Sequence, residues 1–185
     1  MLKHIGTNSI ETLRLKLRRF DERDAKSMYD NWAGDPEVVK YLPWGPHKDS
    51  SVSLKRIQEW MQKYAYPNYY NWAICLKNND TPIGSISVEI QNDTDLTCEV
   101  GYCLGRDYWS RGIMTEALRV VMHYLFYEVG YERIRARHDV LNVASGRVMQ
   151  KCGMQFEKIL YHVSKRRDGS SCDCAVYSKG IRDDA

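Results

Sequence analysis

One short loop carries the residues whose types and spacing best suit an anion-binding device. The segment Tyr108-Trp-Ser-Arg-Gly-Ile-Met-Thr-Glu-Ala117 joins an expected strand to an expected helix, with Gly112 at the turn. The first turn of a helix has unpaired backbone N–H groups and a partial positive charge. Glycine lets an anion approach that backbone closely, so the segment can bind a phosphate group. An ordinary strand-to-helix turn has the same pattern, and Gly112 alone does not decide between these interpretations.

The loop differs from two common nucleotide-binding loops. The sequence contains no Gly-x-x-x-x-Gly-Lys-Ser/Thr run, which excludes a P-loop. It also contains no Gly-x-Gly-x-x-Gly run, which disfavours a Rossmann dinucleotide site. A nucleotide hydrolase is therefore disfavoured.

A second polar pair stands at the expected start of a later helix. Asn142 and Ser145 are three residues apart, so both can face the same side of the first helical turn. Asn142 can cap this helix, with Ser145 as a first-turn residue, and the role is then purely structural. Alternatively, both side chains point into a cleft between two strands and contact a ligand.

Hydrophobic periodicity predicts the elements that must position these residues. Alternation of leucine with basic residues over 12–20 predicts a strand, and Ser50 or Ser51 can cap the helix that follows a Pro-rich loop. Gly130 and Gly153 are expected to end helices. The expected order is a strand over 12–20, helices over 24–32 and 50–64, strands over 71–77, 82–90 and 96–104, a helix over 112–128, a strand over 132–138, a helix over 143–151, and strands over 156–164 and 172–179.

This order predicts one domain of the α+β class. The length of 185 residues suits one domain, and no repeat or flexible linker divides the chain. Turns at 78–80, 92–93 and 168–169 are expected to join antiparallel strands. The strand–helix–strand unit over 96–138 must be a parallel crossover, because its connection is long and helical. We therefore expect a mixed, mostly antiparallel central sheet with flanking helices.

Composition excludes several classes of function. The net charge of +3 is too small to indicate binding of nucleic acid or membrane, and no apolar run approaches the ~20 residues of a membrane helix. Residues 1–10 do not form a signal peptide, so a cytoplasmic location is expected. Cys172 and Cys174 alternate along one strand face, which favours core packing over a metal site. Two basic clusters, 14–19 and 165–167, are either solvated or attract an anionic ligand.

Taken together, these segments resemble the GNAT superfamily of acetyltransferases, and within it the RimJ/RimL-type N-terminal acetyltransferases. The resemblance covers nearly the whole chain, and the loop 108–117 is its most specific part. The segments that carry it, in the order of the family, are Leu13–Arg19, Trp44–His47, Glu99–Tyr102, Tyr108–Ala117 and Asn142-x-x-Ser145. It implies the GNAT fold and transfer of an acetyl group from acetyl-coenzyme A (acetyl-CoA) to a primary amine.

The resemblance also implies which residues hold acetyl-CoA. Backbone N–H groups of the loop 110–115 would bind its diphosphate, while the backbone at 102–104 would pair with its pantetheine arm and Asn142 would hydrogen-bond that arm. The implied cofactor-binding residues are Tyr102, Cys103, Leu104, Trp109, Ser110, Arg111, Gly112, Ile113, Met114, Thr115, Asn142 and Ser145. The family often has smaller residues at Ser110 and Met114, so these side chains crowd the loop.

The implied chemistry is direct attack of a neutral amine on the thioester. Ser145 is the candidate donor to the departing thiolate, and Glu99 is either the base, acting directly or through water, or a structural carboxylate. Backbone N–H groups of separated strands can stabilise the oxyanion. An acyl-enzyme at Cys103 would need an activated thiolate, for which the sequence shows no clear partner. Weaker candidates for polar roles are Glu116, Asp173, His47 and His138.

The acceptor amine is the least determined part of the prediction. The resemblance implies a protein N-terminal α-amine, as on ribosomal proteins. The pattern does not decide between a monomer and a homodimer. The expected substrate-binding residues are Trp44, His47, Glu99 and Asp173. The alternatives are a polyamine, amino acid or aminoglycoside acceptor, or a non-catalytic acetyl-CoA-binding module. The carboxylates suited to a polyamine are Asp30, Asp35, Glu37 and Asp49, unless they cap helices.

Overall fold

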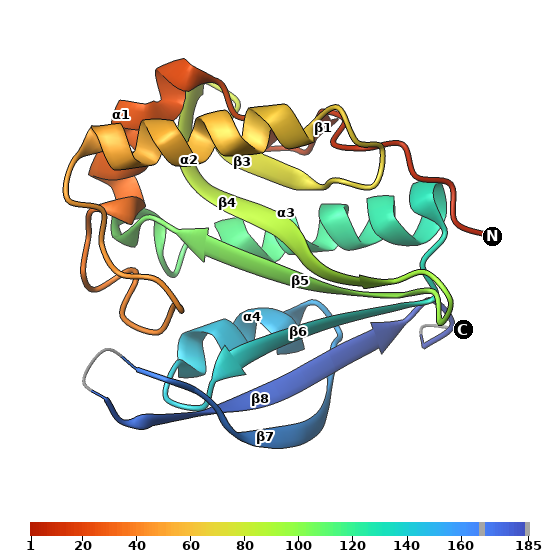
Figure 1. The fold of residues 1–185 in the computed structure, drawn as a ribbon. Coiled ribbons are helices and arrows are strands. Elements are labelled where there is room, and N and C mark those ends of the chain that lie inside the picture. Colours follow the sequence, from red (N-terminus) through yellow and green to blue (C-terminus); the bar gives the residue numbers. More distant parts are fainter. Residues whose placement is uncertain (167–168, 184–185) are drawn as a thin grey trace.

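An eight-stranded sheet organises the computed structural model, which describes residues 1–166 and 169–183 (Figure 1). The strands lie in the order β1-β2-β3-β4-β5-β6-β8-β7, and only the neighbours β5 and β6 run parallel among the described strands. This confirms the mixed sheet and its parallel crossover. The strands are β1 (Ile10–Glu11), β2 (Leu15–Arg18), β3 (Asn71–Leu76), β4 (Asn79–Asn92), β5 (Thr97–Leu104), β6 (Arg133–Asp139), β7 (Gln155–Lys165) and β8 (Ser171–Gly180).

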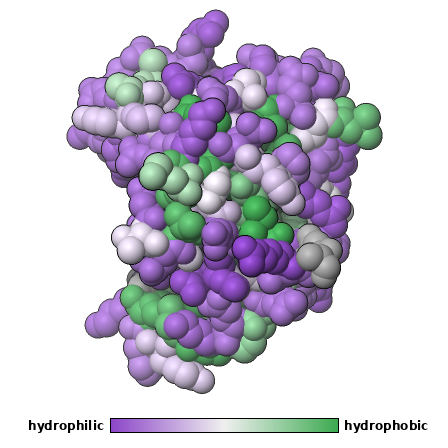
Figure 2. All heavy atoms as spheres, turned by 90° about the vertical axis from the view of Figure 1, so that its right-hand side faces the viewer, coloured by the Kyte–Doolittle hydropathy of each residue, from purple (hydrophilic) through white to green (hydrophobic). Residues whose placement is uncertain are grey.

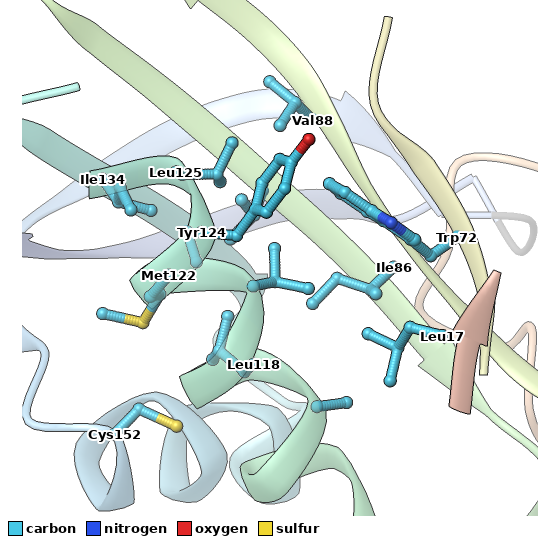
Figure 3. Packing of buried hydrophobic residues seen from close by; sticks show 14 of the residues in the cluster. Leu17, Trp72, Ile86, Val88, Leu118, Met122, Tyr124, Leu125, Ile134 and Cys152 are labelled. Carbon is cyan, nitrogen blue, oxygen red and sulfur yellow. The ribbon is translucent and has the colours of Figure 1, made fainter. Parts of the chain in front are cut away.

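Helices cover both faces of the sheet, and each face has its own hydrophobic cluster. On one face α1 and α2 pack with Ala73 and Cys75 of β3, and on the other face α3 packs against β2–β6. Figure 3 shows Leu118 of α3 among buried side chains of the sheet. The helices are α1 (Ala25–Met28), α2 (Ser50–Lys63), α3 (Ile113–His123) and α4 (Val143–Lys151), with shorter 3₁₀ or π segments at Glu22–Asp24, Tyr29–Ala33, Arg106–Tyr108 and Tyr124–Val129.

The surface and the helix lengths add two plain observations. The end of the molecule at which both termini lie is largely hydrophilic, and its hydrophobic residues gather in a central band (Figure 2). Of the helices that the structure describes, none has the length and apolar character needed to cross a bilayer.

Two expected elements near the N-terminus were wrong in extent. The strand predicted over 12–20 is confined to β2, because the chain reverses at Thr12, whose N–H donates to the Leu15 carbonyl (2.9 Å). Leu13 is consequently 90% exposed instead of facing the core. The helix predicted over 24–32 is broken into a 3₁₀ turn, α1 and a π turn, and this π turn ends where the Gly34 N–H donates to the Tyr29 carbonyl.

Other boundaries differ by smaller amounts. Asp49, not Ser50 or Ser51, caps α2 by accepting from the Ser51 N–H (2.8 Å). The helix predicted over 112–128 is α3 followed by a π segment, and Gly130 ends it in a left-handed conformation (φ 98°). The turn expected at 168–169 includes Asp168, which lies outside the described residues. The predicted helix over 143–151 matches α4 at both ends.

The parallel strands β5 and β6 separate toward their C-terminal ends. Their pairing stops at Val100 and Ala136, although β5 continues to Leu104 and β6 to Asp139. Figure 1 shows the two strands diverging, with α4 beginning just after β6. The backbone groups of β5 that face β6 beyond Val100 have therefore lost their partner strand. This opening positions the site.

Candidate functional site

The loop between β5 and α3 has the conformation of an anion-binding turn. Ser110 (φ 59°) and Gly112 (φ 72°) both adopt the left-handed region, which glycine accepts more readily than serine. Gly112 is the N-cap of α3, and no side chain caps the first turn of this helix. The loop is anchored by the Trp109 Nε1–H, which donates to the Leu104 carbonyl (2.7 Å). The dipole of α3 and the uncapped first turn of this helix thus suit a phosphate group.

A groove of about 620 Å³ runs along the outer surface of α3 from this loop. Three of its cations, Arg14, Arg119 and Lys151, come from the β1–β2 turn, α3 and the end of α4. Its lining residues are Arg14, Gly112, Thr115, Glu116, Arg119, Val120, His123 and Lys151. A cationic groove that continues from a phosphate-binding turn can hold an extended phosphorylated ligand.

Glu116, a weaker candidate base, instead connects α3 to the β1–β2 turn at the groove. Its carboxylate accepts from the Arg14 Nε (2.7 Å) and from the Thr12 hydroxyl (2.6 Å). Burial alone would raise the pKa of Glu116, but these hydrogen bonds outweigh burial and lower it. Arg14 also donates to the Arg111 carbonyl (2.9 Å), so Arg14 connects the β1–β2 turn to the anion-binding loop.

Tyr102 and Ser145 meet across the opening between β5 and β6. The Ser145 hydroxyl donates to the Tyr102 phenol oxygen (3.1 Å), and the Tyr102 O–H donates to the Ser145 carbonyl (3.1 Å). Asn142 caps α4, since its side-chain oxygen accepts from the Ser145 N–H (3.3 Å). The capping interpretation is therefore confirmed for Asn142, while Ser145 also reaches toward β5. Contact of either residue with a ligand stays a prediction.

Glu99 lies on β5 next to an arginine of β6. The Arg137 Nε is 2.9 Å from a carboxylate oxygen of Glu99, whose side chain is 15% exposed. Burial raises the pKa of Glu99, the charge of Arg137 opposes that rise, and the charge of Glu89 adds to it. Tyr102 packs against the α3-side cluster and Cys103 against the α1–α2 cluster, so Glu99 shares the α1–α2 face with Cys103. Glu99 is thus a largely buried carboxylate with a raised pKa, and its role as a base stays a prediction.

Glu89 is a carboxylate that sequence reasoning did not single out. It stands where the pairing of β4 with β5 shifts register, between Val88 and Ile90. A Cβ at Gly101 would lie 3.0 Å from Cγ of Glu89, so the Glu89 side chain lies directly over Gly101. Alternation places Glu89 on the face of Ser85 and Ser87, but only the strand pairing brings it near Glu99. The sequence offered no signal that distinguished it from a solvated strand residue.

The surroundings of Cys103 disfavour an acyl-enzyme. Its sulfur is 3.3 Å from the Ser85 hydroxyl, and burial raises the pKa of the thiol to about 11. A thiol with a raised pKa carries little thiolate near neutral pH and is a poor nucleophile. Direct transfer therefore remains the better mechanism. Cys172 and Cys174 are buried with their sulfurs 3.7 Å apart, as expected for core packing.

The remaining predicted substrate residues are not all brought together. Trp44 and Cys103 both pack on the α1–α2 cluster, and the His47 ring contacts Trp44 and bonds the buried Ser53 hydroxyl (2.8 Å). Asp173 instead accepts from the backbone N–H of His162 in the β7–β8 hairpin (2.8 Å).

The acidic residues suited to a polyamine are engaged elsewhere. Asp30 pairs with Lys26, Asp35 pairs with Arg106, and Asp49 caps α2. The backbone N–H of Glu37 donates to the Asp35 carboxylate (2.9 Å). The carboxylates of Asp30, Asp35 and Asp49 therefore have the structural roles that the sequence left open, whereas Glu37 takes part only through its backbone.

Comparisons with known proteins agree with this geometry. Residues 14–155 match the family model described as an acetyltransferase (GNAT) domain. An uncharacterized N-acetyltransferase, p20, from Bacillus licheniformis is 28% identical over 170 residues, covering 92% of this chain and 94% of that protein. The ribosomal protein uS5-alanine N-acetyltransferase of Escherichia coli is 25% identical over 156 residues, covering 80% of this chain and 78% of that protein.

A solved structure shares the fold at lower identity. The ribosomal L7/L12 α-N-protein acetyltransferase RimL, in complex with coenzyme A, superimposes with a TM-score of 0.83 at 19% identity, covering 94% of this chain and 98% of that chain. The family match over most of the sequence, together with the phosphate-binding turn and the separated strands, identifies the chain as an acetyl-CoA-dependent N-acetyltransferase of the GNAT family.

Proposed function

We propose that this enzyme acetylates the N-terminal α-amine of a protein, with ribosomal proteins as the acceptor class. The observation that carries the proposal is the opening between β5 and β6, which has Glu99 on one face and the Tyr102–Ser145 pair on the other. The E. coli and RimL relatives are named for ribosomal-protein acceptors. A polyamine acceptor is less suitable, because Asp30, Asp35 and Asp49 are already paired or used as caps.

The residues present fit acetyl-CoA, which supplies the activated acetyl group. The uncapped first turn of α3 would hold the diphosphate through backbone N–H groups of 110–115, and a Cβ at Gly112 would lie 3.6 Å from the Arg14 Nη2, so this guanidinium lies beside the turn. Arg14, Arg119 and Lys151 in the groove would hold the nucleotide end. The unpaired backbone of β5 at 102–104 would bind the pantetheine arm as a neighbouring strand does.

In this proposal the residues at the opening divide the proton chemistry between them. Glu99 accepts the proton that the attacking amine releases, and its raised pKa makes it a better base near neutral pH. Arg137 holds the Glu99 carboxylate in place. Backbone N–H groups of β5 stabilise the oxyanion, and the Ser145 hydroxyl hydrogen-bonds the departing thiolate.

Thiol release from acetyl-CoA in the presence of an amine panel tests the acceptor. The panel holds peptides that begin with Ala or Ser, the same peptides with a blocked N-terminus, spermidine and an aminoglycoside. We expect turnover with the free peptides and none with the blocked ones. Preferential turnover of spermidine or the aminoglycoside would identify a small-molecule acetyltransferase. Binding of acetyl-CoA without turnover on any amine would indicate a non-catalytic module.

A further inference from the structure

The first turn of α4 is held by both of the strands that separate. From β5, the Tyr102 phenol makes two hydrogen bonds to Ser145, each 3.1 Å long. From β6, the His138 ring packs so closely that a Cβ at Gly146 would lie 2.6 Å from its Nε2. The His138 Nδ1 lies 2.7 Å from the Asp139 carbonyl, which fixes the ring. The position of the Ser145 hydroxyl is therefore set from two sides.

We propose that Tyr102 is a positioning residue that aims the Ser145 hydroxyl at the departing thiolate. The proposal rests on the acetyl transfer proposed above and adds a side-chain role for Tyr102, in addition to the backbone role at this position. In the free enzyme the Ser145 hydroxyl donates to Tyr102, so its hydrogen is not available to a ligand. When sulfur develops negative charge, both hydroxyl groups rotate. Tyr102 then donates to the Ser145 oxygen, and Ser145 donates to sulfur.

The rotation moves hydrogens between acceptors without breaking an O–H bond. Glu99 passes the amine proton to solvent, and the thiolate takes a proton from solvent as it leaves, so the Tyr102–Ser145 pair ends as it began. Burial raises the pKa of Tyr102, and the hydrogen bond from Ser145 only partly offsets this. The phenol therefore keeps its proton over the working pH range and can always act as the donor.

Stability alone does not account for the Tyr102 hydroxyl. The Asn142 side chain already caps the Ser145 N–H, so the first turn of α4 does not need Tyr102 as a cap. The Tyr102 ring packs against the α3-side hydrophobic cluster, and a phenylalanine ring would fill the same space. The Tyr102 hydroxyl bonds both the carbonyl and the hydroxyl of Ser145, and only the second bond acts on the proposed donor to sulfur.

Steady-state kinetics of Tyr102→Phe test this role. We expect kcat to fall by about tenfold or more, the effect of one hydrogen bond to a charged group, with the KM for acetyl-CoA within about twofold. The double variant Y102F/S145A should be no slower than S145A, because the two hydroxyl groups act as one unit. The control is Tyr177→Phe. The Tyr177 hydroxyl accepts a hydrogen bond from Gln150 of α4 (3.3 Å) but does not bond Ser145. Full kcat in Y102F, equal losses in Y102F and Y177F, or additive losses would each overturn the proposal.

Calorimetry with coenzyme A and its dethio analogue tests the same role without turnover. Wild type should bind coenzyme A more tightly than dethio-coenzyme A at alkaline pH, where the thiol ionises, and Y102F should lose this preference while binding the analogue normally. An unchanged preference in Y102F would overturn the proposal. If wild type shows the preference but acetylates no amine, the acetyl transfer fails while the positioning role stands.

Discussion

At the scale of single residues, the central group is the Glu99 carboxylate, whose surroundings shift its pKa in opposite directions. Burial raises the pKa of Glu99, and Arg137 at 2.9 Å favours the ionised form. A base must be ionised to accept a proton and must have a pKa close to the working pH to do so efficiently. Burial exceeds the influence of Arg137, so the pKa of Glu99 is raised, which is the direction that a general base needs.

The pH dependence of kcat/KM tests this assignment. For wild type, kcat/KM should rise with pH through the raised pKa of Glu99, because the carboxylate must lose its proton to act. Glu99→Gln should lower kcat by about a hundredfold or more and remove that limb. Glu128→Gln, at an exposed position on the segment after α3, is the control and should keep wild-type behaviour. If E99Q retains both the rate and this limb of the pH profile, Glu99 is only a structural carboxylate.

At the scale of elements, the sequence predicted regular segments well and irregular ones poorly. The period of α4 and its cap Asn142 gave both ends of that helix, since one apolar face and one cap determine it. The prediction for residues 22–33 was wrong, because three helical geometries follow each other there while the spacing of the hydrophobic residues does not change. The register shift at Glu89 was not visible, since it depends on the partner strand β5. The Tyr102–Ser145 contact joins two elements that only the tertiary fold brings together.

The end of β6, which leads into α4, depends on a buried ion pair. Arg166 contacts both carboxylate oxygens of Asp139 (2.5 and 2.7 Å), and the Asp139 side chain is 1% exposed. Burial alone would raise the pKa of Asp139, but the hydrogen bonds from Arg166, the Leu141 N–H and the Cys172 thiol, together with the Arg166 charge, lower it below the usual 3.8. A lowered pKa stabilises the fold above 3.8 and loses that contribution as the pH falls through the folded-state value.

Removal of the Asp139 charge should therefore destabilise the protein. Asp139→Asn leaves the Arg166 guanidinium without its buried partner and should cost about 3–5 kcal/mol near neutral pH. The difference in unfolding free energy between D139N and wild type should shrink in acid, where wild type loses the same ion pair. Urea unfolding at several pH values measures both effects. Asp30→Asn, which breaks the exposed pair with Lys26, should cost under about 1 kcal/mol. Equal stabilities of D139N and wild type would contradict this account of the β6 end.

At the scale of the whole molecule, the groove proposed to hold the nucleotide end of acetyl-CoA is assembled from distant parts of the chain. Arg14 comes from the β1–β2 turn, Gly112 and Arg119 from α3, and Lys151 from the end of α4. The sequence indicated the turn at Gly112, because a strand-to-helix loop is local. It could not indicate that Lys151 and Arg14 flank the same helix, since this follows from how the sheet places the elements around α3.

Isothermal calorimetry of acetyl-CoA binding tests the central claim most directly. We predict saturable binding to one site on wild type, about tenfold weaker in Arg119→Gln, because a charge-assisted phosphate contact is lost. Arg23→Gln, at a side chain 88% exposed, should bind as wild type does. Absence of binding to folded wild-type protein would contradict the account.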